Sequence, residues 1–281
     1  SYGWAMGYLG GGILLALNLA FYTFSDALGV PGDLAVRINL ASAGLWWLGF
    51  SFLTWKRLRP RHAARQLPAG ETYASIGFKQ LRKTISEVKH FPETIRFLIA
   101  YFLYNDGIQT VIAVASTFAA APLIQGGLEL EQQTLIAVIL MIQFVAFFGA
   151  LFWGKLAGRI GAKQSVVVSL VIWAGVVIYA YGGLYGETRI AQFFVLGIFI
   201  ALVMGGSQAI SRSLFAQMIP NGKEAEFFSF YEISERGTSW IGPLIFGLAN
   251  QVFGNLRYAI LSLIFFFIAG LILLPFVNVN K

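Results

Sequence analysis

A cluster of polar side chains interrupts the apolar stretch 93–119, where Asn105, Asp106 and Gln109 fall close together. A charged side chain at the centre of a bilayer costs about 2.5–3.5 kcal/mol on insertion scales, so it marks a functional site by default. If a helix enters the membrane near residue 93, Asp106 lies about 20 Å along it, near the midplane or beyond. Its carboxylate could take up a proton, hold a cationic group of a solute, or pair with a basic residue of another helix. Gly107 beside it predicts local unwinding, as at transporter binding sites.

A second polar group follows two glycines in the apolar stretch 189–212. Gln208 and Ser211 are three residues apart, so they share one helical face. They could support Asp106 in binding a solute, or form hydrogen bonds between helices that contribute about 0.6 kcal/mol each. Arg212 lies nearer the end of the stretch, where we expect a gate contact. Gln143, alone in the stretch 132–154, could line a cavity.

Charged residues open the stretch 227–250. Glu232 and Arg236 are four residues apart with the acid first, the favoured order for an ion pair on one helical face. The pair could serve the bundle structurally, or belong to a charge relay that closes a cytoplasmic gate together with Glu235.

Several kinds of chemistry are not indicated. The chain has no Cys, its two histidines (His62 and His90) lie in a polar segment, and it has neither an HExxH motif nor a P-loop. We therefore predict no enzyme, no metal site and no cofactor. Its composition, 57% hydrophobic and 12% charged, excludes a soluble domain, which usually carries about 25% charged residues. The net charge of +7 does not indicate a nucleic-acid partner, because the basic residues lie between apolar stretches.

Apolar runs of about 20 residues predict helices that span the membrane. The runs are continuous and show no alternation with period two, which excludes barrel strands. The prediction is an all-α, polytopic transmembrane bundle of about eight spans: 2–25, 33–55, 93–119, 132–154, 164–184, 189–212, 227–250 and 256–277.

The basic residues predict an orientation in the membrane. Nine of them lie between the second and third spans, and six more lie in every second loop and at the end of the chain. The alternate loops carry only Arg189 and Arg257. By the positive-inside rule the rich side is cytoplasmic, so both ends of this chain are expected in the cytoplasm.

The segment 56–92 is the only long polar stretch. Within it, residues 76–88 alternate apolar and basic side chains at helical spacing, which predicts an amphipathic helix on the cytoplasmic membrane face. The expected organisation is a helix pair in 1–55, this linker in 56–92, and a six-helix bundle in 93–281. The chain starts at Ser1 without Met, which suggests a partial sequence.

The loop 154–163 reads GKLAGRIGAK. It resembles the cytoplasmic loop signature of the major facilitator superfamily, G-x-L-x-D-R-x-G-x-K/R, which follows the second helix of each six-helix half. Its place after the second span beyond the linker matches the carboxy-terminal half. Gly158 stands where that family has Asp, which puts the charge relay of the motif in doubt in this half. Arg159 and Gly161 are kept, and we expect them at the cytoplasmic gate.

Longer stretches narrow the resemblance. GYLGGG at 7–12, AYFLYNDGIQT at 100–110, GGSQAISRSLFAQMIP at 205–220 and GKEAEFFSFYEISERGTSWIGP at 222–243 resemble the autophagy-linked vacuole-effluxer-like family. The resemblance implies helices five to twelve of a twelve-helix transporter whose two bundles rock about a central site. Residues 1–55 would then be the last two helices of the amino-terminal bundle. Yeast members are associated with release of amino acids from the vacuole.

The leading prediction is a secondary-active permease for a small polar solute, with amino acids as the expected class and a proton as a possible coupled ion. Its partners would be the lipid bilayer and the solute, and its location a bacterial plasma membrane. The alternative is a non-transporting scaffold or receptor that uses the 56–92 loop as its partner surface. Loss of partner binding on deletion of that loop, without any solute flux, would indicate the alternative.

Overall fold

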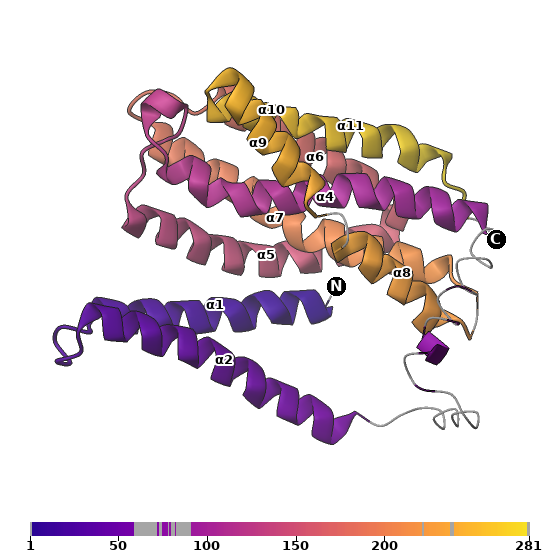
Figure 1. Ribbon diagram of the computed structural model, residues 1–281, viewed down its shortest axis with the longest axis horizontal. Helices are drawn as coiled ribbons and strands as arrows, with labels where there is room; N and C mark the ends of the chain where they lie inside the picture. The colour runs from indigo at the N-terminus through magenta and orange to yellow at the C-terminus, as the bar shows by residue number, and fades with distance from the viewer. Residues whose placement is uncertain are drawn as a thin grey trace. The chain divides into compact units, whose positions relative to one another are not determined.

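The computed structural model describes most of the chain, and every regular element in the described part is a helix (Figure 1). The predicted all-α fold is confirmed there. Contacts divide the chain into two compact units, residues 9–80 and residues 1–8 with 81–281. The division predicted at 56 and 92 stays a prediction, and most of the expected amphipathic helix 76–88 lies outside the described residues. Described are residues 2–58, 72, 75–77, 79, 82, 91–220, 222–236 and 239–279.

The smaller unit holds a hairpin made of most of α1 (Tyr2–Thr23) and α2 (Gly32–Arg57). Two asparagines join the helices by reciprocal hydrogen bonds: Asn39 Nδ2 donates to the Asn18 carbonyl at 2.9 Å, and Asn18 Nδ2 donates to the Asn39 carbonyl at 3.4 Å. Ser42 Oγ donates to Asn18 Oδ1 at 2.9 Å. The carboxamides of Asn18 and Asn39 therefore join the two helices and find their hydrogen-bond partners within the hairpin.

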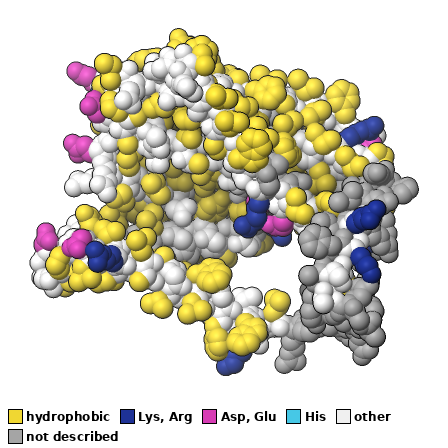
Figure 2. Space-filling model, in the orientation of Figure 1, with side chains coloured by type: hydrophobic (Ala, Val, Ile, Leu, Met, Phe, Trp, Pro, Cys, Tyr) yellow, Lys and Arg dark blue, Asp and Glu magenta, His cyan; other side chains and the backbone are white. Residues whose placement is uncertain are grey.

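The larger unit is a helical bundle. In Figure 1 the long helices α4, α5, α6 and α7 run along its length, with α5 and α6 both packed against α7, and α11 against α4. Figure 2 shows hydrophobic side chains spread widely over this unit's visible face. The elements are α4 (Pro92–Ala120), η1 (Leu123–Gln125), α5 (Gln132–Ile160), α6 (Ala162–Gly182), α7 (Arg189–Gln217), α8 (Glu224–Arg236), α9 (Ile241–Phe253), α10 (Leu256–Ser262), α11 (Ile264–Leu273) and η2 (Leu274–Phe276).

Six helices among the described residues are long and apolar enough to cross a membrane. They correspond to six of the expected spans, and α2 is 26 residues long but less apolar. The expected span 227–250 is not one helix: α8 ends at Arg236 and α9 starts at Ile241. Pro243 lies in the first turn of α9, where its missing N–H costs no helical hydrogen bond. The six are Tyr2–Thr23, Pro92–Ala120, Gln132–Ile160, Ala162–Gly182, Arg189–Gln217 and Leu256–Phe276.

Glycines bring α5 and α7 into close contact. A Cβ added at Gly206 of α7 would overlap the ring of Trp153, and one added at Gly149 of α5 would lie 2.6 Å from the Leu202 carbonyl oxygen. Trp153 is buried and donates its Nε1–H to that same carbonyl at 2.8 Å. The small residues therefore let the backbones approach, as is usual for packed membrane helices.

Arg257 closes the end of the bundle that carries few basic residues. Although the sequence places it in a loop, its side chain is buried, and its guanidinium donates to the carbonyls of Ala180, Tyr181 and Leu184. Its guanidinium carbon lies 4.0 Å from the ring centroid of Tyr185. Arg257 thus satisfies carbonyls at the end of α6, which have no partner within the helix.

Replacing Arg257 by Ala is expected to lower stability by about 1.5–3 kcal/mol, the usual contribution of a charge-assisted hydrogen bond. Arg257→Lys should recover only part of the loss, because an ammonium cannot reach three carbonyls with the planar geometry of a guanidinium. Thermal unfolding of the purified protein in detergent measures both. The exposed Arg37 supplies the control, since Arg37→Ala should leave the midpoint unchanged. Equal shifts for Arg257→Ala and Arg37→Ala would contradict the capping role.

Candidate functional site

Asp106 caps the helix that follows the break. Its Oδ2 accepts a hydrogen bond at 2.7 Å from the backbone N–H of Gly242, in the first turn of α9, and the residue is 1% exposed. The first N–H groups of a helix lack partners within the helix and form the positive end of its dipole, so a carboxylate stabilises this end. A Cβ at Gly242 would overlap Thr110 Oγ1, so only glycine permits this approach.

One expectation for Asp106 is not met. The helix does not unwind at Gly107, since α4 continues from Pro92 to Ala120. Gly107 instead admits α11, where an added Cβ would lie 2.7 Å from Phe266 Cβ. The alternative of a basic partner stays a prediction: among the described residues Asp106 forms no ion pair, and it meets a helix terminus instead. The break lies in the neighbouring chain segment rather than in the helix that bears the carboxylate.

Polar atoms near Asp106 are left without partners. Its Oδ1 and the Oδ1 of Asn105 are both buried and accept no hydrogen bond. Within the described part of the chain, the side chains of Gln109 and Gln143, which are half-buried, and of Gln208, which is buried, also form no hydrogen bond to the protein. A carboxamide transferred to apolar surroundings without partners costs about 1–3 kcal/mol on mutational scales. These groups therefore need water or a solute.

The unpartnered carboxamides of α4 share a face. Asn105, Gln109, Ile112 and Ser116 follow one another at intervals of four, three and four residues, which places them along one side of the helix. Ile112 and Ser116 line a cavity of about 250 Å³ between α4, α5 and α7. Asp106 is rotated about 100° from Asn105, toward α9. The structure thus brings Asn105 and Gln109 to the cavity side and Asp106 to another.

The facing helices supply the other two carboxamides. Gln143 of α5 lines the same cavity, as do Gly197, Ile200 and Met204 of α7. Gln208 comes four residues after Met204, so it continues the cavity face of α7.

Ser211 differs from these groups because its hydroxyl is fully engaged. Its Oγ lies 2.7 Å from the hydroxyl of Tyr104 and donates to the Ser207 carbonyl at 2.6 Å, and it is buried. The geometry thus favours the helix-joining role for Ser211.

Charged residues meet where α7 and α8 pass each other. Arg236 donates to Glu232 Oε2 at 3.4 Å, so the expected pair between Glu232 and Arg236 is present. Arg212 of α7 also donates to Glu232, to its Oε1 at 3.1 Å. Tyr101 of α4 donates to Glu235 Oε2 at 3.1 Å. Together these contacts hold α8 against both α4 and α7.

The signature-like loop makes a sharp turn between α5 and α6. Gly161 has φ +88°, a backbone conformation that residues other than glycine rarely adopt. Arg159 is exposed in the last turn of α5. Lys163 donates to the carbonyls of Pro275 and Val277, both at 2.7 Å, which ties the loop to the end of α11 and η2.

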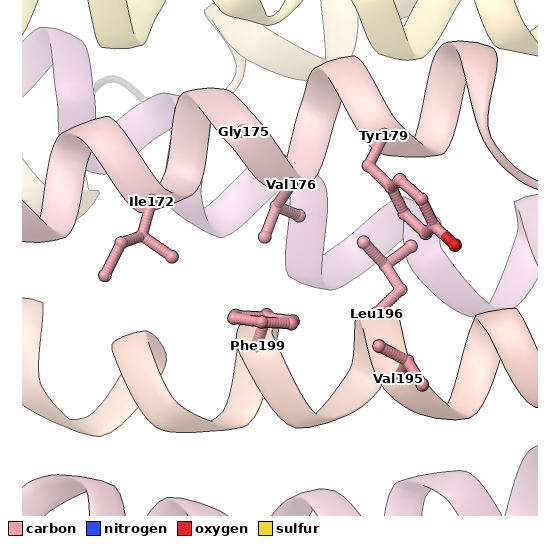
Figure 3. A pocket seen from close by; sticks show the side chains of 7 residues that line it. All are labelled: Ile172, Gly175, Val176, Tyr179, Val195, Leu196 and Phe199. Atoms are coloured by element: carbon pink, nitrogen blue, oxygen red, sulfur yellow. The ribbon is translucent and has the colours of Figure 1, made fainter.

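A groove of another kind lies between α6 and α7. Figure 3 shows Ile172 and Val176 of α6 facing Phe199 of α7, and the hydroxyl of Tyr179 is the only polar atom among its labelled side chains. The groove has a volume of about 360 Å³. Without amides or charges it suits lipid tails rather than a polar solute.

Comparison with known proteins then decides the family. The sequence profile of the family "Vacuole effluxer Atg22 like" matches residues 1–281, the whole chain. The chain belongs to this family. The resemblance drawn from the short motifs is thereby confirmed.

Relatives of this Atg22-like chain come from bacteria and fungi. It is 30% identical over 277 residues to the "Uncharacterized MFS-type transporter YxiO" of Bacillus subtilis, which covers 98% of the chain and 62% of that protein. It is 32% identical over 294 residues to "Autophagy-related protein 22-1" of Aspergillus niger, which covers 98% of the chain and 45% of that protein. The chain therefore spans about half to two thirds of the length of these relatives. No solved structure matches it.

In the Atg22-like chain, three residues of the candidate site are weak signals in the sequence: Gln143 and Ser116, which line the cavity, and Gly242, which binds Asp106. A single polar residue in an apolar helix is a weak signal unless its neighbours across the helix interface are known. The spacing of Ser116 from Gln109, seven residues on one helical face, was the available clue.

Proposed function

We propose that the protein is a secondary-active transporter of small polar solutes, with amino acids as the expected class, acting by alternating access. The observation that carries the proposal is a set of four carboxamides that form no hydrogen bond to the described residues: Asn105, Gln109, Gln143 and Gln208. Gln143 lines the cavity, and the spacing of the other three places them on the helical faces of α4 and α7 that continue it. The asparagines of the α1–α2 hairpin, which serve structure, are by contrast hydrogen-bonded to each other. Membership of a family with transporter relatives supports the same proposal.

Asp106 is proposed as the group that takes a proton or a cationic part of the solute. Its unpartnered Oδ1 can bind a proton while Oδ2 still accepts from Gly242. Neutralising the carboxylate weakens its attraction to the positive end of α9. Binding of a proton or a cationic group at Asp106 would therefore loosen the start of α9. Ser211 is proposed as a supporting residue, because its contact with the Tyr104 hydroxyl joins α7 to the part of α4 that bears Asp106.

The contacts between α7 and α8 are proposed as the gate, together with Arg159 and Gly161 of the signature-like loop. The basic end is proposed to face the cytoplasm and the membrane to be a bacterial plasma membrane.

If Arg212 and Glu232 act as one latch, Arg212→Ala should change solute flux by less than about fivefold, as expected for an exposed pair. Glu232→Ala should change it by at least as much, because it also removes the contact of Arg236. The double variant should add nothing further. Flux through reconstituted protein measures all three, and additive effects would contradict a shared latch.

The transport proposal is tested by counterflow of a mixture of radiolabelled amino acids in liposomes, with and without a pH gradient. Gln109→Leu and Gln208→Leu should each lower flux about twofold to tenfold, the value of one hydrogen bond to the solute. Gln192→Leu is the matched control, because Gln192 is hydrogen-bonded to Tyr185 and Thr188 at a loop. Its flux should stay normal. Absence of flux for every amino acid under both conditions would overturn the proposal.

A further inference from the structure

The cavity between α4, α5 and α7 has a mixed lining. Most of it is apolar, including Ile139 of α5 and Phe193 of α7, and among the lining residues only Ser116 and Gln143 have polar side chains. Among the described residues, no charged one lines it. Its volume of about 250 Å³ equals that of about eight water molecules in the liquid. Such a space accepts an apolar group of side-chain size.

Small residues leave this space open. Ala115 and Ser116 are adjacent on α4, and both line the cavity where larger side chains would fill it. On α7, an added Cβ at Gly197 would lie 3.1 Å from Met141 Cε and 3.2 Å from Val138 Cγ1, so glycine there lets the side chains of α5 come close.

The two polar side chains of the cavity, Gln143 and Ser116, have hydrogen-bonding groups that a bound molecule could use. Gln143 offers two N–H donors and an acceptor, and Ser116 offers one donor and an acceptor. Ser116 is exposed and Gln143 is half-buried, and neither forms a hydrogen bond to another described residue. A lipid tail would leave them unpaired, unlike in the α6–α7 groove, whose only polar side-chain atom is the Tyr179 hydroxyl.

We propose that this cavity is the subsite for the apolar part of the transported solute, and that Gln143 and Ser116 hydrogen-bond to an uncharged group at its margin. The proposal rests on the transport function proposed above. It is supported by continuity, because Gln109 and Gln208 lie on the same faces of α4 and α7 and would meet the more polar part of the solute. Cavity size would then select among solutes by the length of their apolar part.

The absence of Cys from this chain permits a direct test. Ser116→Cys is nearly isosteric, and its modification rate by a maleimide reports access to the cavity. The probes are straight-chain primary amides from propanamide to heptanamide, which carry an uncharged hydrogen-bonding group and a growing apolar tail. The concentration that halves the modification rate should fall about threefold to fourfold per added methylene until the cavity is full.

Two second-site variants separate the parts of the proposal. Adding Ala115→Phe to Ser116→Cys should abolish the dependence on tail length, because the ring fills the cavity. Adding Gln143→Leu should weaken protection by about twofold to tenfold for every amide and keep the dependence on length. The matched control is Ala113→Cys, since Ala113 is exposed like Ser116 but does not line the cavity, and amides should not protect it.

Protection equal at both Cys positions, or independent of tail length, would overturn the subsite. So would phospholipid that remains bound to the purified protein and is lost on Ala115→Phe, because a lipid tail would then be the occupant. The counterflow assay keeps the two proposals apart. Amino-acid flux without length-dependent protection leaves transport standing and removes the subsite, whereas protection without any flux supports the binding site and removes the transport function.

Discussion

Asp106→Ala is expected to free the start of α9 and to abolish transport, whereas Asp106→Asn should keep the fold and change solute flux and its response to protons. Alanine leaves the Gly242 N–H buried without an acceptor, which costs about 1–3 kcal/mol. Asparagine retains an acceptor oxygen at the same place but carries no charge. The two substitutions therefore separate the hydrogen bond from the charge.

Three measurements check this expectation: thermal unfolding in detergent, hydrogen exchange of the amides at the start of α9, and flux as a function of pH. Asp106→Ala should lower the unfolding midpoint and speed exchange in α9, and Asp106→Asn should do so much less. Asp33→Ala is the control, because Asp33 is 73% exposed and lies in the smaller unit.

Two outcomes would contradict the expectation for Asp106. Equal destabilisation by Ala and Asn would mean that the charge, rather than the hydrogen bond, holds α9. Normal flux with unchanged pH dependence in Asp106→Asn would remove Asp106 from solute and proton binding.

Gly206→Ala is expected to destabilise the larger unit by about 1–3 kcal/mol, because its Cβ would overlap the ring of Trp153. Trp153 cannot easily move aside, since it is buried and its indole N–H is bonded to the Leu202 carbonyl. The α5–α7 interface must then open or the tryptophan must lose its hydrogen bond. Either change also disturbs the cavity that the two helices share with α4.

The control for Gly206 is another glycine inside a helix. A Cβ at Gly175 of α6 would meet no atom within 4 Å, so Gly175→Ala should be neutral or raise stability by up to about 1 kcal/mol through helix propensity. Thermal unfolding of both variants, with Trp fluorescence to follow the surroundings of Trp153, measures the difference. If both variants had the same midpoint as the parent protein, close packing at Gly206 would not limit stability.

Hydropathy alone predicted most of the fold because membrane helices must satisfy their backbone groups internally and must match the bilayer in length. It could not predict the break between α8 and α9. The segment 227–250 is apolar enough to read as one span, and the break is stabilised by a residue more than a hundred positions earlier, Asp106. Arg257 shows the same limit, since its burial depends on carbonyls exposed at the end of α6.

The candidate site was predictable in its residue types but not in their grouping. Sequence placed Asp106 with Asn105 and Gln109 because they are adjacent, yet helix geometry turns Asp106 toward α9 and the two carboxamides toward the cavity. Gln143 is a candidate only because the fold places α5 beside α4 and α7, where its side chain lines their shared cavity. Which faces of the helices meet is decided by packing, such as the contact of Gly206 with Trp153, and no single helix encodes it.

The hydrogen bonds between Asn18 and Asn39 bear on how the protein enters its membrane. A carboxamide that waits for a partner from a later helix must spend time unpaired in hydrocarbon during synthesis. Here each partner is supplied by the adjacent helix, across a turn of a few residues. The hairpin of α1 and α2 can therefore leave the insertion machinery as a finished pair, before the cavity-forming helices that follow it have been made.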